Sequence, residues 1–218
     1  MAIGVLCGAY SHKHTVCFDM AFMRINPNMV VSAPMDEVEL RNLMYTAQLE
    51  KNKFPFSIRY PRGRGIFAEW QKPFVEIEIG KSRQISEGND LAVLSIGHPG
   101  IVVASVVSNL AKENISIAHF DMRFVSPLDV DALHSVFKKF RYIITVEDGI
   151  LKGGFGSAVI EFMSDNGYNS EVRRLGIPDY FVEHGTQEEL YRECGYDEEG
   201  IELAIREILV RKQDKDKR

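Results

Sequence analysis

Two arginines near the end of an apolar segment have the right chemistry to bind an anion. Arg59 and Arg62 flank Tyr60 and Pro61, and the preceding run from Phe54 to Tyr60 is typical of a strand that the proline ends. Ligand sites of open α/β sheets lie at the carboxyl ends of strands. A guanidinium there can bind phosphate or carboxylate through two parallel hydrogen bonds. Arg59 and Arg62 are therefore candidate substrate-binding residues, and surface ion pairs are the alternative.

Histidines and cysteines near the start of the chain form a second candidate group. His12 and His14 lie in a polar segment without periodicity, where a histidine can either transfer a proton or simply be solvated. Cys7 and Cys17 bracket them, which raises the question of a zinc site. The spacing does not match the tight ligand pairs that zinc sites use. We therefore predict two apolar thiols, two loop histidines and no metal site.

A glycine-rich segment, residues 147–157, follows an apolar run and precedes a helical pattern. Free amides at a helix N-terminus can hold a phosphate, but the segment lacks the spacing of both the P-loop and the dinucleotide fingerprint. Glycines at Gly153, Gly154 and Gly156 could instead permit a sharp turn and close packing of helix on sheet. Both interpretations remain open from the sequence, as does the role of the adjacent carboxylates Glu147 and Asp148.

Composition narrows the class of protein. The chain has 218 residues, 45% of them hydrophobic and 26% charged, with a net charge of -5, which is typical of a globular protein. An acidic balance argues against nucleic acid as a partner, and the absence of a long apolar run argues against a membrane span. Three cysteines are too few for a disulfide framework and favour a reducing compartment. We expect a cytoplasmic protein.

The elements that must position these residues alternate between strand and helix. After a glycine- and proline-containing segment at residues 63–74, which we interpret as an interdomain linker, the alternation predicts βαβ units and a mostly parallel sheet. Asp36, Asp129, Thr186 and Asp197 have the residue type and spacing of helix N-caps. The expected strands are 28–32, 54–60, 76–84, 91–96, 116–121, 142–147 and 171–175, and the last helix is expected to end near Val210, before a frayed tail at 211–218.

The order of several segments carries a family resemblance. PNMVVSAPMDEVELRNLMYTA is followed by SIRYPRG, IGK, DMRFVSPLD, TVED with GGFGS, and LGIPDYFVEHGTQEEL. This order, from about Phe18 to Leu209, resembles the 1-deoxy-D-xylulose-5-phosphate synthase family of transketolase-like enzymes. Single pieces are shared with transketolases and with 2-oxo acid dehydrogenase beta subunits, whereas RYPRG combined with the last segment is more specific.

The resemblance implies a fold and a domain plan. Residues 1–72 would be part of an α/β pyrimidine-binding domain, and residues 73–218 a transketolase C-terminal domain with a mostly parallel five-stranded sheet. The family's members are dimers that condense pyruvate with glyceraldehyde 3-phosphate and release carbon dioxide. They use thiamine diphosphate as the electron sink and Mg²⁺ to bridge the diphosphate. The family's cofactor and metal ligands lie in segments with no counterpart here, so we expect this chain to bind neither by itself.

The resemblance also assigns roles to single residues. His14 falls on a family histidine and would be catalytic, while Arg59 and Arg62 would face the substrate. Tyr10 stands where the family has an aspartate, and Ile3 where it has a substrate-binding arginine. These departures indicate that the stretch from Ala2 to Val16 is altered.

Three functions remain open at this stage. The chain could be a synthase fragment that is inactive alone, or a beta-type subunit of a split transketolase or 2-oxo acid dehydrogenase that needs a partner chain. It could also be an interaction module without enzymatic activity on this fold. If early strands of its first domain are missing, the strands at 28–32 and 54–60 would be exposed edges. We therefore expect self-association or binding of an N-terminal partner segment.

Overall fold

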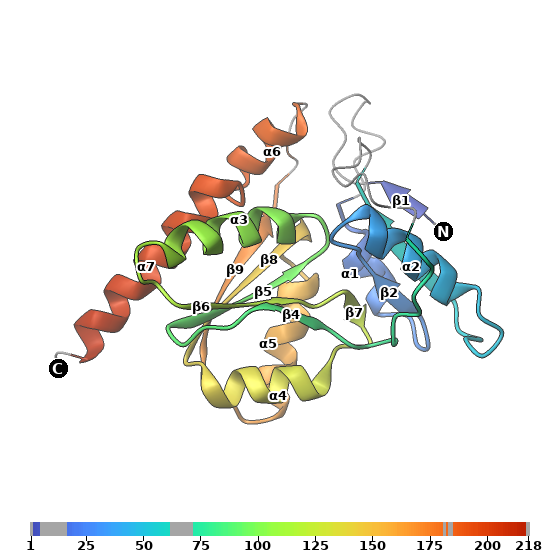
Figure 1. Ribbon diagram of the computed structural model, residues 1–218, viewed down its shortest axis with the longest axis horizontal. Helices are drawn as coiled ribbons and strands as arrows, with labels where there is room; N and C mark the ends of the chain where they lie inside the picture. The colour runs from blue at the N-terminus through green and yellow to red at the C-terminus, as the bar shows by residue number, and fades with distance from the viewer. Residues whose placement is uncertain (1, 5–16, 62–71, 181, 183–184, 217–218) are drawn as a thin grey trace.

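The computed structural model describes residues 2–4, 17–61, 72–180, 182 and 185–216. The described residues form two sheets with helices packed on them (Figure 1). The larger sheet has five strands and lies between two helical layers, so the predicted α/β class with a mostly parallel five-stranded sheet is confirmed.

The five-stranded sheet has the order β4-β6-β5-β8-β9. The four strands β6, β5, β8 and β9 are parallel to one another, and β4 pairs antiparallel with β6 at one edge of the sheet. The strands are β4 (Arg83–Ser86), β5 (Leu91–Ile96), β6 (Ile117–Asp121), β8 (Tyr142–Ile150) and β9 (Glu171–Ile177). The expected strand at 76–84 is wrong in its position, because the segment pairs into the sheet only from Arg83 onward.

Helices cover both faces of this sheet, which explains why β5 and β8 are buried along their whole length. In Figure 1, α3 and α7 lie above the sheet and α4 and α5 lie below it. The helices are α3 (Pro99–Ala111), α4 (Val130–Lys139), α5 (Phe155–Asp165), α6 (Gln187–Glu193) and α7 (Glu198–Asp216). None of the helices in these described ranges is both long and apolar enough to cross a membrane.

The smaller sheet has the order β1-β3-β2-β7. Its elements are β1 (Ala2–Gly4), α1 (Asp19–Arg24), β2 (Val30–Ser32), α2 (Glu37–Ala47), β3 (Phe56–Tyr60) and β7 (Phe124–Ser126). Strand β7 comes from the later part of the chain and pairs antiparallel with β2. The expectation that 28–32 and 54–60 form exposed edges is therefore wrong: β2 lies between β3 and β7, and β3 lies between β1 and β2.

The helix caps confirm the predicted N-cap positions. The side chains of Asp36 and Asp129 accept hydrogen bonds from the backbone amides three residues later, and Asp197 accepts one from Gly200. Thr186 forms the full reciprocal capping box with Glu189. The prediction of a frayed tail is wrong, because α7 continues to Asp216.

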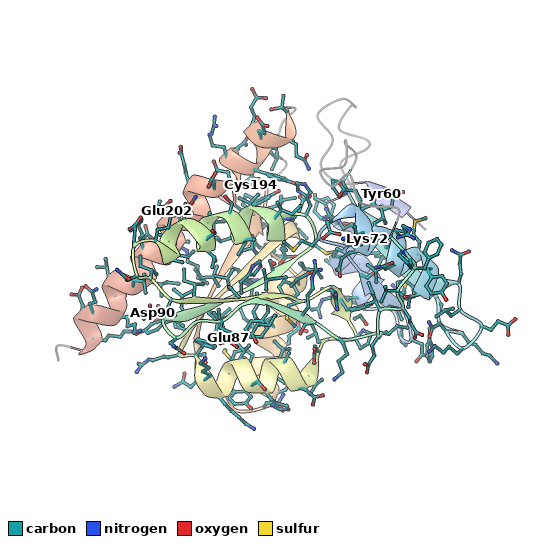
Figure 2. The ribbon with its side chains drawn as sticks, in the orientation of Figure 1. Tyr60, Lys72, Glu87, Asp90, Cys194 and Glu202 are labelled. Carbon is teal, nitrogen blue, oxygen red and sulfur yellow. The ribbon has the colours of Figure 1, made fainter. Side chains whose placement is uncertain are left out.

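Contacts with the sheet edge account for the longer last helix. Lys212 Nζ lies 3.1 Å from Asp90 Oδ1, and Lys215 Nζ lies 2.8 Å from Glu171 Oε2. Asp90 lies beside the C-terminal half of α7 in Figure 2. A tail that is polar in sequence is thus held in a helix by ion pairs whose partners are more than 40 residues away.

One of the apolar clusters contains side chains from both sheets. The cluster beneath the five-stranded sheet includes Met20, Val31 and Ala33 of the first unit (residues 17–61) together with side chains of β5, β6, α4 and α5. This sharing is why the first unit packs directly against the carboxyl edge of the larger sheet.

Candidate functional site

The candidate site lies between β5 and β8, two neighbouring strands whose outgoing connections lead to opposite sides of the five-stranded sheet. From β5 the chain passes to β6 on one side, and from β8 it passes to β9 on the other. The carboxyl ends of β5 and β8 therefore border a topological switch point, where open α/β sheets bind ligands. His98 follows β5 here, and Glu147 and Asp148 lie near the end of β8.

The first unit, rather than open space, occupies this crevice. A Cβ placed on Gly97 would lie 3.2 Å from the Ala33 Cβ, and one placed on Gly149 would lie 2.5 Å from the Met20 Cε. The Ile150 amide also donates to the Cys17 carbonyl at 3.0 Å. The glycines at the two strand ends thus let the first unit approach the sheet closely.

Arg59 lies at the centre of a buried charge network in this junction. Its side chain is 4% exposed, and its Nε lies 2.9 Å from Asp19 Oδ2, while its Nη1 lies 3.8 Å from Asp148 Oδ2. Burial alone would lower the pKa of Arg59, but the carboxylates of Asp148 and Asp19 raise it. Arg59 therefore remains charged and joins α1 to the end of β8.

Asp148 is held from the opposite side by two buried phenols. Tyr196 donates to its Oδ1 at 2.9 Å, and Tyr191 donates to its Oδ2 at 3.3 Å. Burial, reinforced by the Asp148 carboxylate, raises the pKa of both phenols, so they stay neutral donors.

His98 borders the same network. Its ring centroid lies 6.5 Å from that of Tyr191, and its Nδ1 is buried without a hydrogen-bond partner in the described part of the chain. Burial lowers the pKa of His98, while the carboxylates of Asp148 and Glu37 oppose that shift. A neutral imidazole is the form favoured by this environment.

In the glycine-rich segment at 147–157, the first amides of α5 bind an internal carboxylate. The Glu147 side chain accepts hydrogen bonds from the amides of Phe155 and Gly156, each at 2.8 Å, at the start of α5. A Cβ on Gly154 would lie 2.3 Å from Glu147 Oε2. Close packing is thus the correct interpretation, because an internal carboxylate already holds the position that a phosphate would take. Burial raises the pKa of Glu147 to about 7, against the opposing effect of the two amides.

The structure places one of the three predicted site residues. Arg59 lies in the junction, facing Asp19 and Asp148 rather than an open pocket. His14 and Arg62 lie outside the described residues, so their roles remain predictions. The sequence did not reveal Asp19, Tyr191 or Tyr196 as partners, since they are 40 or more residues away from the groups that they contact. Within the described ranges, no three histidine, cysteine or carboxylate side chains cluster as metal ligands would.

The part of the chain that forms the five-stranded sheet matches a known protein family. The family model described as the C-terminal domain of transketolase matches residues 80–201, which include Asp148, Tyr191 and Tyr196. The chain belongs to this family. Arg59 and Asp19 lie before the matched region, so the junction joins the transketolase C-terminal domain to the unit that precedes it.

The chain is also similar, over nearly its whole length, to curated proteins named 1-deoxy-D-xylulose-5-phosphate synthase. It is 61% identical over 201 residues to the 1-deoxy-D-xylulose-5-phosphate synthase of Cytophaga hutchinsonii, covering 92% of this chain and 32% of the relative. The synthase of Bacteroides fragilis is 53% identical over 207 residues, covering 94% of this chain and 32% of that protein. The chain thus resembles the C-terminal portion of these synthases and spans about a third of their length.

A solved structure extends the likeness beyond the C-terminal domain. A split gene transketolase, described as an inactive beta4 tetramer, superposes with a TM-score of 0.76 at 27% identity. The match covers 90% of this chain and 62% of the other. It therefore includes both sheets.

Proposed function

We propose that this chain is the C-terminal portion of a 1-deoxy-D-xylulose-5-phosphate synthase and acts only together with the remaining two-thirds of such an enzyme. The reaction is the condensation of pyruvate with glyceraldehyde 3-phosphate, with loss of carbon dioxide. The observation that carries the proposal is the 61% identity to the Cytophaga hutchinsonii synthase over 92% of the chain. Identity at this level extends across both sheets and the junction between them.

The cofactor of the synthases would be held elsewhere. Thiamine diphosphate serves as an electron sink when bound, and a divalent cation binds its diphosphate. The described residues do not fit this group, since the carboxylates in the junction already pair with Arg59, with two phenols or with the amides of α5. The contribution of this chain is therefore a scaffold that orients β3 and its carboxyl end.

A second candidate is a beta-type subunit that completes an active site with a separate partner chain. The specific observation in its favour is the structural likeness to a split gene transketolase. That protein is described as a tetramer of beta chains that is inactive, and by analogy this chain would self-associate and lack activity until its partner is supplied.

One set of enzyme assays separates the two candidates. In a chimera, residues from Phe18 onward replace the matching region of the Cytophaga hutchinsonii synthase, and product formation is measured with pyruvate, glyceraldehyde 3-phosphate, thiamine diphosphate and Mg²⁺. We expect an active chimera and an inactive isolated chain. The unmodified synthase is the positive control.

In a further assay, this chain is mixed with the separately expressed N-terminal region of the Cytophaga hutchinsonii synthase that precedes the matching part, and product formation is measured in the same way. Activity in the mixture would favour a split subunit, and activity confined to the chimera would favour a portion of a single-chain enzyme. An inactive chimera that folds and binds thiamine diphosphate would contradict both candidates.

A further inference from the structure

We propose that Asp148 is a positioning residue that the C-terminal domain contributes to the active site, acting through the guanidinium of Arg59. The proposal rests on the proposed function for its relevance to catalysis, but its geometry stands by itself. Asp148 and Arg59 come from different sheets and are both at least 96% buried, since they are 1% and 4% exposed. The pair therefore ties the carboxyl end of β3 to the carboxyl end of β8.

The guanidinium is held on two sides and left unpaired on a third. Nε bonds Asp19 at 2.9 Å and Nη1 faces Asp148 at 3.8 Å, whereas Nη2 is buried with no hydrogen-bond partner among the described residues. Backbone pairing to β1 and β2 fixes the strand on both sides of Arg59. With the backbone fixed, the two carboxylates determine where the side chain points.

The charge balance argues against Arg59 as a phosphate receptor. Among the described residues, one guanidinium faces two carboxylates, Asp19 and Asp148, so its positive charge is already matched and these three groups together would repel a phosphate. A buried arginine in such a pair is a structural donor with its Nη2 still available to a neutral oxygen. The substrate-binding role predicted for Arg59 is thus recast as positioning.

The two phenols make Asp148 responsive to the rest of the C-terminal domain. Tyr191 lies in α6, and Tyr196 lies in the turn before α7, and each donates to one oxygen of Asp148. Removing either donor would leave buried charge less satisfied, which destabilises the ionised carboxylate. The position of α6 and α7 is thereby transmitted through Asp148 to Arg59 and β3.

The test is a spectroscopic signature of Arg59 in this chain. A buried, ion-paired guanidinium gives an Nε–Hε resonance protected from exchange with solvent, assigned through its loss in Arg59→Lys. We expect Asp148→Asn to shift that resonance and to speed its exchange by about tenfold, because the guanidinium loses the ionic partner that faces its Nη1 at 3.8 Å and is held by Asp19 alone. Asp148→Glu should retain the protected resonance, because it keeps the charge.

Glu147→Gln is the matched control. Glu147 neighbours Asp148 on the same strand and is equally buried, and the described structure shows no hydrogen bond or ion pair from it to Arg59. Its substitution should move the Arg59 resonance far less than Asp148→Asn does, because Glu147 acts on Arg59 only through longer-range electrostatics. If Glu147→Gln moves the resonance as much as Asp148→Asn does, or if Asp148→Asn leaves it unchanged, the proposal is overturned.

Tyr196→Phe keeps the test decisive if Asp148→Asn does not fold. It removes a single 2.9 Å hydrogen bond to Asp148 and should speed exchange of the Arg59 Nε–Hε by several-fold; an unchanged exchange rate would contradict the proposal. No step of this experiment requires activity. An inactive chimera with a shifted Arg59 resonance would therefore refute the proposed function and leave the positioning role intact.

Discussion

Buried carboxylates at the end of β8 are separated by one peptide bond and have different partners. Asp148 faces a guanidinium and two phenols, whereas Glu147 receives two backbone amides and is 0% exposed. Burial raises the pKa of Glu147 to about 7, above its ordinary value of 4.5. Protonation of this residue should therefore affect the stability of the fold.

The pH dependence of stability has a definite sign at Glu147. Between about pH 4.5 and pH 7 the unfolded chain releases this proton while the folded chain retains it, so its contribution to stability falls as pH rises. The stability of the wild type relative to Glu147→Gln should decline by on the order of 3 kcal/mol across that window. Denaturant unfolding of both proteins from pH 4.5 to 8 measures it, and a difference that is constant or that grows with pH would refute the assignment.

At the residue scale, the sequence predicted the position of a residue along its strand better than it predicted which side chains that residue contacts. Arg59 was expected at the carboxyl end of a strand, and it lies there, because strand periodicity and Pro61 are local signals. Its pairing with Asp19 and Asp148 spans 40 and 89 residues, so no local pattern could reveal it. For the same reason the glycine-rich segment left two interpretations open, since the decisive carboxylate is that of Glu147, whose orientation depends on the fold.

At the scale of single elements, the short helix α6 depends on its cap. It has seven residues, and Thr186 and Glu189 satisfy its first amides reciprocally. Thr186→Ala should therefore destabilise the protein by about 1 kcal/mol, while Thr186→Ser, which keeps the hydroxyl, should stay close to the wild type. Chemical denaturation of the three proteins tests this, and equal losses in both variants would show that the hydroxyl is not what matters.

Hydrogen exchange can check the interior position of β2. The strand pairs with β3 on one side and β7 on the other, so its amides should exchange nearly as slowly as those of β8. The edge strand β4, which pairs with β6 alone in the described sheet, serves as the control and should exchange faster. Peptides covering β2 that exchange as fast as those covering β4 would mean that the smaller sheet opens in solution.

Sequence patterns located most elements, and their failures have one physical cause. Caps, periodicity and prolines are local, and they predicted the starts of α2, α4, α6 and α7. The length of α7 and the pairing of β7 with β2 depend on ion pairs and backbone contacts between distant segments. The expectation of an exposed edge at 28–32 failed for this reason, because the strand that covers it comes about 95 residues later in the chain.

At the scale of the whole molecule, the two sheets share a core and a charge network. Glu39 of α2 accepts hydrogen bonds from Arg123, and Arg83 bonds Asp121 at 3.0 Å beside it. Together with Arg59 and Asp148, these contacts hold the first unit against the carboxyl edge of the larger sheet. The transketolase C-terminal domain thus uses its switch point to dock a neighbouring unit, in the place where other α/β sheets bind a ligand.

We propose that this chain supplies that docking domain and that the rest of a synthase binds the cofactor. Calorimetric titration of the isolated chain with thiamine diphosphate and Mg²⁺ tests it most directly, with the intact Cytophaga hutchinsonii synthase as the positive control. We predict no measurable heat of binding for the chain, because the carboxylates of the junction, Asp19, Glu147 and Asp148, are already paired within the fold. A dissociation constant in the micromolar range for the isolated chain would contradict the account.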